Sequence, residues 1–356
     1  MKALAITHKE LEKVTELEIN ELIQTKTTIK PSCVLFEPKT QKDLAIIAYK
    51  AQSIKKVILL IDSFKIKTLE DIEKNINLKK IKDLIKTTFA IKCLKIENKE
   101  LSSNDISYEL SGLIKGKTDY KNPETVLLIY IYKNDCYIGI DQLDIDLSKR
   151  EYRIYIHQEA LKATIAYSLL KIADYKKEDT ILDPFCGSGT ILIEAALFST
   201  NLSQNYYSKD KFEKLETDLE KLDKTTKPKG KIIGYDKELR HIIAAKKNAK
   251  IAGIEKNITF SKIEAKDLDL KIEQEQIDKI ITHPPNLSKR NQPFIEKTYN
   301  EFFKNAYIIL KEKGTITLIT KTDLIRDIAE KNNFKIKQQI PINIGLDKYD
   351  IICFEK

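Results

Sequence analysis

The sequence has no long hydrophobic run, few cysteines and little arginine, and each absence excludes a class of protein. No apolar stretch approaches the roughly 20 residues that cross a bilayer, and the amino-terminal residues lack the hydrophobic region of a signal peptide. The five cysteines lie far apart without a Cys-x-x-Cys pair, which argues against a zinc site and against a disulfide framework. We therefore expect a cytoplasmic protein that has neither a membrane segment nor a metal site.

Positive charge is present, but lysine carries almost all of it. The formal net charge is +9, from 62 Lys and Arg residues against 53 Asp and Glu residues. These lysines are spread along a chain rich in Ile and Asn, a composition typical of A/T-biased coding. The charge permits a polyanionic partner but does not identify one.

The length predicts more than one domain, because 356 residues exceed a single core of about 100–200 residues. Residues 1–61 alternate three strand patterns with two helical patterns, an order that predicts a small ferredoxin-like unit. The spacing Thr7-x-x-Glu10 predicts a capping box at the start of the first helix, and the second helix is expected near Thr40.

Residues 62–147 predict a second small α/β module. Helical patterns lie near 68–85 and 104–115, and strand patterns at 126–132 and 136–140 are separated by a short polar turn. We expect these two strands to form a hairpin.

From residue 148 onward strands and longer helices alternate, which predicts a doubly wound, mostly parallel seven-stranded sheet of the Rossmann type. The polar segment 200–229 is predicted to be a surface insertion. Two final strand patterns, near 334–342 and 349–354, predict a closing hairpin.

The most specific motif is DPFCGSGT, residues 183–190, which follows a buried strand and precedes the helical pattern ILIEAAL. A glycine-rich turn lets a ligand approach the backbone closely, and the exposed N–H groups of a helix start favour a carboxylate. A dinucleotide fingerprint would need Gly-x-Gly-x-x-Gly, but Leu192 stands at the third glycine position. An acid ahead of the turn, Asp183, suits a cationic ligand end such as an α-ammonium group.

The string DPFCGSGTILIEAA resembles the cofactor motif of RNA N2-guanine methyltransferases whose front half carries a THUMP domain. The segment KREYRIYIHQEALKATIAYSLLKIA is similar to the family's entry into the catalytic domain, and NPETVLLIYIYKNDCYIGID looks like the end of a THUMP domain. The resemblance covers essentially the whole chain. It implies a ferredoxin-like domain at 1–61, a THUMP domain at 62–147 and a class I methyltransferase domain at 148–356.

The resemblance also implies a set of residues for S-adenosylmethionine. Asp236, which ends the next strand in IIGYD, would accept hydrogen bonds from the ribose hydroxyls, and Asp267 would contact the adenine amino group. The methionine part would be held by Asp183 together with the turn formed by Phe185, Cys186, Gly187, Ser188, Gly189 and Thr190.

The catalytic motif of the family is Asn/Asp-Pro-Pro-Tyr/Phe, whereas this sequence has His283, Pro284, Pro285 and Asn286. In the family motif, an oxygen acceptor and the proline carbonyl bind the exocyclic guanine amine, which is otherwise a poor nucleophile. The aromatic residue stacks on the extruded base. A neutral His283 retains an acceptor nitrogen, but Asn286 does not stack, so Phe294 or Tyr299 would have to replace the aromatic ring.

Two interpretations remain open at this motif, a working variant and a degenerate protein that keeps its RNA and cofactor sites. The other histidines, including His157 and His241, show no metal-ligand spacing and are expected to be surface or core residues. The candidate RNA-phosphate contacts are Lys115, Lys117, Lys121, Arg150, Arg153, Lys289 and Arg290.

The function expected from these residues is methyl transfer from S-adenosylmethionine to the N2 amine of a guanosine in tRNA. The family resemblance implies docking on the acceptor stem and 3′ end by a monomer. Methylation of ribosomal RNA and binding of tRNA without catalysis are the two alternatives. A DNA or small-molecule methyltransferase is disfavoured, because its target domain would follow or interrupt the catalytic domain.

Overall fold

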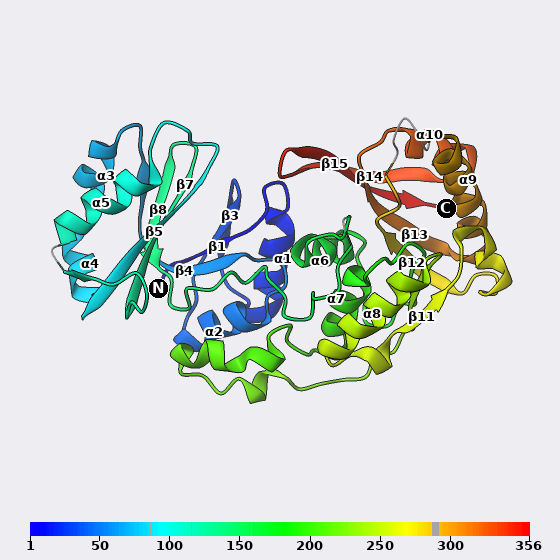
Figure 1. The fold of residues 1–356 in the computed structure, drawn as a ribbon, viewed down its shortest axis with the longest axis horizontal. Coiled ribbons are helices and arrows are strands. Elements are labelled where there is room, and N and C mark those ends of the chain that lie inside the picture. The colour runs from blue at the N-terminus through cyan, green and yellow to red at the C-terminus, as the bar shows by residue number, and fades with distance from the viewer. Residues whose placement is uncertain (86, 115, 158, 287–291) are drawn as a thin grey trace. The chain divides into compact units, whose positions relative to one another are not determined.

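The computed structural model describes residues 1–85, 87–114, 116–157, 159–286 and 292–356 (Figure 1). The chain divides into two compact units. Unit 1 comprises Met1–His8, Thr15–Leu147 and Asp210–Thr217, and unit 2 comprises Lys9–Val14, Ser148–Lys209 and Asp218–Lys356.

The first elements of unit 1 follow the order β-α-β-β-α-β. They are β1 (Ala3–Ile6), α1 (Glu12–Ile23), β2 (Thr27–Lys30), β3 (Cys33–Phe36), α2 (Gln41–Lys50) and β4 (Lys56–Lys65), with the antiparallel strand order β2-β3-β1-β4. Strand β2 was not predicted, because its mostly exposed sequence TTIK has no apolar alternation that marks a half-buried strand.

The capping box predicted at Thr7 is wrong. Glu10 has φ 70°, and α1 begins only at Glu12. The Thr7 hydroxyl instead donates to the Ser53 carbonyl and accepts from the Thr15 hydroxyl. The second helix does begin with a capping box, in which the Thr40 hydroxyl accepts from the Asp43 backbone N–H at 3.2 Å.

The same sheet continues through the rest of unit 1. The further elements are α3 (Leu69–Asn75), α4 (Leu78–Leu84), β5 (Thr88–Ile96), α5 (Ser103–Ile114), β6 (Lys117–Thr118), β7 (Thr125–Tyr132) and β8 (Asp135–Ile140). The sheet has eight strands in the order β2-β3-β1-β4-β8-β7-β5-β6, and β7 and β8 form the predicted hairpin. The boundary predicted between residues 61 and 62 falls inside β4.

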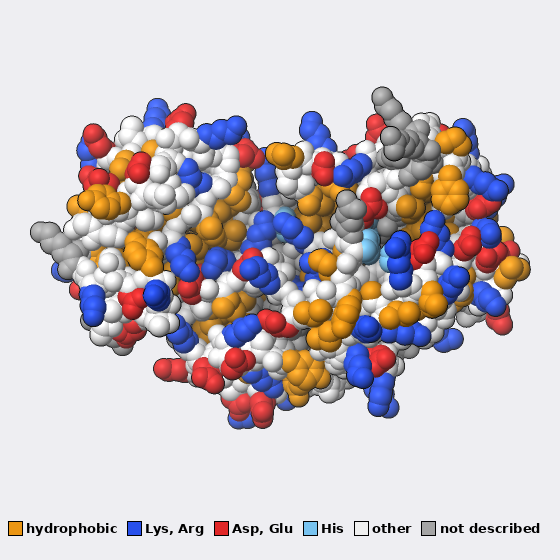
Figure 2. Space-filling model, in the orientation of Figure 1, with side chains coloured by type: hydrophobic (Ala, Val, Ile, Leu, Met, Phe, Trp, Pro, Cys, Tyr) orange, Lys and Arg blue, Asp and Glu red, His pale blue; other side chains and the backbone are white. Residues whose placement is uncertain are grey.

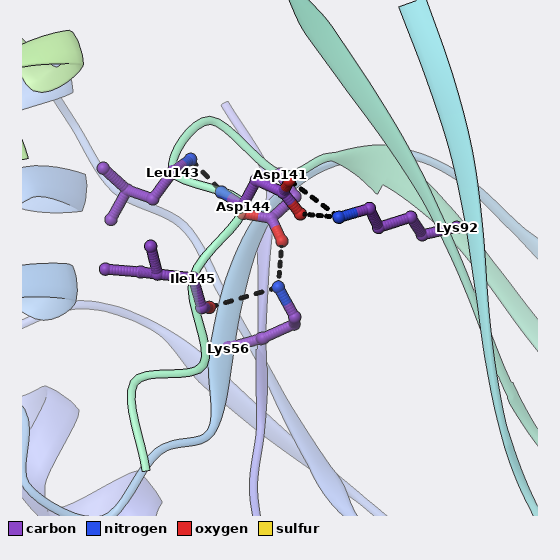
Figure 3. A network of polar contacts seen from close by, with 6 residues as sticks. All are labelled: Lys56, Lys92, Asp141, Leu143, Asp144 and Ile145. Atoms are coloured by element: carbon purple, nitrogen blue, oxygen red, sulfur yellow. Dashed lines mark hydrogen bonds and ion pairs between the residues drawn. The ribbon is translucent and has the colours of Figure 1, made fainter. Parts of the chain in front are cut away.

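A network of lysines and aspartates fixes the segment that leaves β8 (Figure 3). Lys56 on β4 donates to the Asp141 carboxylate and to the Ile145 carbonyl, and Lys92 on β5 pairs with Asp144 at 2.6 Å. Asp141 Oδ1 also accepts from the backbone N–H of Asp144 at 2.8 Å. The network therefore ties the chain after β8 to two strands of the sheet.

Unit 2 is a doubly wound sheet with helices on both faces. Its elements in order are α6 (Ala163–Ile172), β9 (Ile181–Asp183), α7 (Thr190–Thr200), β10 (Ile232–Asp236), α8 (Leu239–Ile251), β11 (Thr259–Lys262), the 3-10 helix η4 (Ala265–Leu270), β12 (Ile277–Thr282), α9 (Gln292–Ile309), β13 (Leu310–Thr320), α10 (Leu324–Lys331), β14 (Lys335–Ile344) and β15 (Asp347–Glu355). The seven strands lie in the order β11-β10-β9-β12-β13-β15-β14, and only β14 and β15 are antiparallel to their neighbours. This confirms the predicted seven-stranded, mostly parallel sheet and its closing hairpin.

The two faces of this sheet carry separate apolar cores. One core contains residues of α6, α7 and α8, and the other contains residues of η4, α9 and α10. Strand β9 lies between β10 and β12, so the direction of winding reverses at β9. A ligand of an open α/β sheet binds beside the carboxyl ends of the strands at such a reversal.

The segment 200–229 is less exposed than predicted. It contains the 3-10 helices η1 (Tyr206–Leu215) and η2 (Glu220–Leu222), and Phe212 and Leu219 are buried. Within unit 1, the Phe212 ring packs edge-on against Tyr49 at a centroid distance of 5.3 Å. Among the described residues, every helix is too short or too polar to cross a membrane.

Candidate active site

The turn after β9 is shaped by two glycines in the left-handed region. Gly187 has φ 51° and Gly189 has φ 83°, and a Cβ atom on Gly187 would lie 2.2 Å from Nε2 of His157. Because L residues rarely adopt this conformation and a methyl group would collide, glycine is required here. Helix α7 begins directly after the turn, at Thr190.

The Asp183 carboxylate is buried at the end of β9. Its Oδ1 accepts the Thr282 hydroxyl at 2.6 Å and the Phe185 backbone N–H at 3.1 Å. Burial raises the pKa of Asp183 to about 7, although both hydrogen bonds act in the opposite direction. The acid that joins the strand ends of β9 and β12 therefore stays protonated at pH values at which an ordinary aspartate is ionised.

Asp236, at the end of β10, holds the glycine turn from the other side. Its Oδ2 accepts the Gly187 backbone N–H at 3.0 Å, and its Oδ1 lies 2.9 Å from the Glu238 backbone N–H and 3.1 Å from Nδ1 of His241. The carboxylate thus connects the ends of two neighbouring strands, the geometry expected of a ribose-binding acid.

A cavity of about 310 Å³ opens against these strand ends. It is lined by His157, Glu159, Pro184, Phe185, Gly187, Asp236, Lys237, His241, Glu264, Ala265, Lys266, His283, Pro285, Phe294, Ile295, Lys297, Thr298 and Glu301. A smaller cavity of about 40 Å³ is lined by Asp183, Cys186, Ser188 and Thr190 among others, and His157, Glu159, Phe185 and His283 line both. The larger volume falls in the range of small-molecule sites.

The structure places Asp267 away from the cavity wall. Asp267 lies within η4 and is not among the lining residues, whereas Glu264, three residues earlier, is. The sequence did not predict Glu264, because nothing in the pattern of a connection between two strands shows which of its acidic side chains faces a ligand.

Two histidines form part of the cavity wall, contrary to the prediction that they are ordinary surface or core residues. His157 and His241 stack at a centroid distance of 5.1 Å with an interplanar angle of 26°. Burial lowers the pKa of His157, and the nearby His241 acts in the same direction. The stacked pair packs against Gly187 and Asp236.

The predicted catalytic segment follows β12 and reaches the same cavity. His283 lines both cavities, and its buried Nε2 atom has no hydrogen-bond partner among the residues that the structure describes. Burial lowers the pKa of His283 to about 4, so the ring is neutral at pH 7. The Pro285 carbonyl accepts the Tyr299 hydroxyl at 2.6 Å.

Asn286 is held by an acid that sequence reasoning missed. Its Nδ2 donates to Oε1 of Glu159 at 3.1 Å, although the two residues are 127 positions apart. Glu159 lies in the segment before α6, and the distance along the chain concealed its position.

The two aromatic residues considered for stacking have different environments. Tyr299 is fully buried in the core of unit 2, so the suggestion that it could stack on a base is wrong. Phe294 is 56% exposed, lines the cavity and carries Lys237 Nζ 4.9 Å from its ring centroid.

The candidate RNA contacts fall into three groups. Lys117 and Lys121 are exposed on unit 1, Arg153 is half-buried, and Lys115, Lys289 and Arg290 lie outside the described residues. Arg150 is buried and its guanidinium pairs with Glu194 at 3.0 and 3.2 Å, so the prediction that it contacts phosphate is wrong. Figure 2 shows Lys and Arg side chains interspersed with acidic ones over the visible face.

Two family models match the sequence. A model described as the RMKL-like methyltransferase domain matches residues 150–350, and one described as a DNA methylase matches residues 8–247. Both matches include the glycine turn at 185–190.

Curated relatives carry the names of RNA methyltransferases. A tRNA (guanine(6)-N2)-methyltransferase of Methanocaldococcus jannaschii is 32% identical over 280 residues, which cover 72% of this chain and 73% of the relative. The protein of the same name from Archaeoglobus fulgidus is 28% identical, over 65% of this chain and 60% of its own length. A ribosomal RNA large subunit methyltransferase K/L of Vibrio campbellii is 27% identical, over 43% of this chain and 24% of its own length.

Solved structures share the fold over nearly the whole chain. A protein of Clostridium difficile 630 described as a possible methylase superposes with a TM-score of 0.80 at 23% identity, over 99% of this chain and 97% of that chain. The protein SMU.472, solved in complex with SAH, superposes with a TM-score of 0.78 at 17% identity and covers the same shares.

Proposed function

The chain belongs to the RMKL-like methyltransferase domain family, and on this premise we propose that it methylates the N2 amine of a guanosine in tRNA. One observation carries the proposal. The glycine turn, Asp236 and the pair His283 and Pro285, which the sequence assigns to cofactor and catalysis, line one cavity. The choice of tRNA as the nucleic acid and of guanine N2 as the target atom is supported by the two relatives named as tRNA (guanine(6)-N2)-methyltransferases.

The residues around the turn fit S-adenosylmethionine as the methyl donor. Gly187 lines the cavity beside His157, and Asp236 presents a carboxylate at the neighbouring strand end, where ribose hydroxyls would donate. The turn from Phe185 to Thr190 would hold the methionine part, and Asp183 would position this turn through its hydrogen bond from the Phe185 backbone N–H. For the adenine amino group, Glu264 is a better placed acceptor than the predicted Asp267, because it lines the cavity.

When bound, S-adenosylmethionine would supply an electrophilic methyl group to the nitrogen and would leave as the neutral thioether that keeps the electron pair of the C–S bond. The chain's own residues hold the amine. We assign the acceptor roles to the neutral ring of His283 and to the carbonyl of Pro284, and the stacking role to Phe294. Asn286 belongs to the same segment but cannot stack.

Unit 1 is the RNA-binding part in this proposal. Its β-α-β-β-α-β portion, which ends with β4 at Lys65, would be the ferredoxin-like domain predicted at 1–61. The remainder would be the THUMP domain predicted at 62–147, which docks on the acceptor stem and 3′ end. The methyltransferase domain then comprises 148–356. The exposed Lys117 and Lys121 are the phosphate contacts that the described residues support.

The decisive experiment is incubation of the purified protein with unmodified tRNA and S-adenosylmethionine labelled on the methyl group. Nucleoside mass spectrometry should find label in N2-methylguanosine. Label in ribosomal RNA alone would favour the second candidate function, methylation of ribosomal RNA, which the similarity to the Vibrio campbellii relative supports. Tight binding of tRNA and cofactor without label in either RNA would identify a non-catalytic binding protein.

A further inference from the structure

We propose that Glu159 is a catalytic residue, the anionic acceptor that binds the target amine and takes its proton. The inference rests on the proposed function, since it deepens the chemistry of the same cavity. It starts from the juxtaposition of Glu159 with Asn286 and His283, two residues of the segment that follows β12.

Three contacts place Glu159 at the reaction site. It lines the large cavity and the small cavity, as His283 does. Its Oε1 accepts the Asn286 amide at 3.1 Å, and its backbone N–H donates to Nδ1 of His157 at 3.2 Å. The segment before α6 thereby brings a carboxylate to the end of β12.

The other carboxylates that line the large cavity have basic partners. Asp236 contacts His241 at 3.1 Å, Glu264 pairs with Lys266 at 3.1 Å, and Glu301 pairs with Lys297 at 3.8 Å. Glu159 instead accepts a hydrogen bond from a neutral amide. Among these four acids, Glu159 is therefore the one whose described contacts include no basic side chain.

A carboxylate oxygen suits the amine at this position. The family motif places an Asn or Asp oxygen at the strand end, whereas this chain has His283, whose neutral ring offers a nitrogen acceptor and no oxygen. The amine becomes cationic as it attacks, and the exposed Glu159 carboxylate, which lines the same cavity, stabilises that developing charge. Glu159 thus supplies from another segment the oxygen that the strand end lacks, and it shares one N–H of the amine with His283 while the Pro284 carbonyl accepts the other.

The proton balance is simple. When the N–C bond forms, the amine nitrogen carries one proton more than the product. The Glu159 carboxylate accepts this proton and releases it to water, so one methyl group is transferred and one proton leaves. No oxidant, reductant or metal is needed.

Two substitutions separate the hydrogen bond from the proton. Glu159→Gln keeps an oxygen acceptor but has lost the basic carboxylate, and Glu159→Ala has lost both. Single-turnover transfer to tRNA should fall by about a hundredfold or more in both variants, the usual range for loss of a positioned acid or base. The Kd for S-adenosylmethionine, measured by calorimetry, should stay unchanged, as should transfer by the control Glu151→Gln, an exposed acid of the same segment.

A binding measurement tests Glu159 independently of turnover. With S-adenosylhomocysteine bound, the wild type should prefer guanosine monophosphate over inosine monophosphate, which lacks the 2-amino group, by about tenfold, the effect of one hydrogen bond to a charged group. Glu159→Gln should keep part of this preference, and Glu159→Ala should lose it.

The outcomes are distinguishable. Equal preference in wild type and Glu159→Ala, or wild-type transfer by Glu159→Gln, overturns the role of Glu159. If the wild type transfers no methyl group to any RNA, the proposed function fails, while the guanosine preference still decides whether Glu159 binds the amine.

Discussion

The Thr282 hydroxyl donates a 2.6 Å hydrogen bond to the Asp183 carboxylate, and this contact joins the carboxyl ends of β12 and β9. The two residues are 99 positions apart, yet they connect the cofactor turn to the catalytic segment. Both side chains are buried, and Asp183 lines the smaller cavity but not the larger one. A change at Asp183 should therefore alter stability as well as cofactor binding.

We predict that Asp183→Asn stabilises the protein at pH 8 and has little effect at pH 4. The folded-state pKa of Asp183 is raised to about 7, above an unfolded value of 3.8, so its contribution to stability is fully present below pH 3.8 and is lost as pH rises through 7. The asparagine oxygen still accepts both hydrogen bonds without a buried charge. The gain at pH 8 should be on the order of 4 kcal/mol, from about three pKa units at about 1.4 kcal/mol each.

Urea unfolding at the two pH values measures this difference, with the exposed Asp174→Asn as the control. An equal effect of Asp183→Asn at both pH values would contradict a raised pKa. Calorimetry on the folded variant should also show weaker binding of S-adenosylmethionine.

A second prediction concerns His283. His283→Ala should lower kcat by about a hundredfold, since an acceptor beside the amine is lost, while His283→Asn, which restores the family residue, should retain most of the activity. Because the pKa of His283 is about 4, His283 should cause no decline in kcat between pH 7 and 6, where an ordinary histidine becomes charged, and His283→Asn should have the same profile as the wild type there. A pH–rate profile of the wild type with a His283-dependent decline in that interval would refute a neutral ring.

The parts of the site that lie within one motif could be predicted from the sequence. The strand, turn and helix around residues 181–200 follow from local apolar runs and glycines, and the structure reproduces them within a few residues. The end of β12 was predicted for the same reason. These positions are determined by short-range backbone geometry, which the residue pattern expresses directly.

The parts that depend on long-range contacts could not be predicted. Glu159 and His157 come close to the catalytic segment only through the tertiary fold, and the family resemblance of their segment assigns no role to either residue. Arg150 looked like a surface charge because KREYR is a polar run, yet its guanidinium is buried against Glu194. Arginine side chains are exposed in most proteins, but whether a particular arginine such as Arg150 is buried depends on the tertiary fold.

We predict that Gly187→Ala abolishes cofactor binding and that removing the His157 ring rescues it only in part. The added Cβ would lie 2.2 Å from His157 Nε2, so Gly187→Ala/His157→Ala relieves the collision. The φ of 51° remains strained for alanine by about 1 kcal/mol, and this share of the loss should persist. Calorimetric Kd values of the single and double variants measure it, and full rescue by His157→Ala would show that the backbone conformation is not required.

The last prediction separates structural from RNA-binding cations. Arg150 and Tyr152 both donate to Glu194, in a cluster whose three side chains are buried. Arg150→Met leaves the Glu194 carboxylate without its cation, so we expect a loss of about 3–5 kcal/mol in the free energy of unfolding. Arg150→Met/Glu194→Met removes both charges and should recover much of this loss, which urea unfolding of the two variants tests.

Lys121 should behave in the opposite way, because its side chain is exposed on unit 1. Lys121→Ala should leave the unfolding free energy unchanged within about 0.5 kcal/mol. If Lys121 contacts a phosphate, the slope of log K for tRNA against log salt should decrease by about 0.7–0.9, whereas folded Arg150→Met should keep the wild-type slope. A reduced slope in Arg150→Met would mean that the wild-type Arg150 guanidinium leaves Glu194 and binds an RNA phosphate. That result would contradict a purely structural role for Arg150.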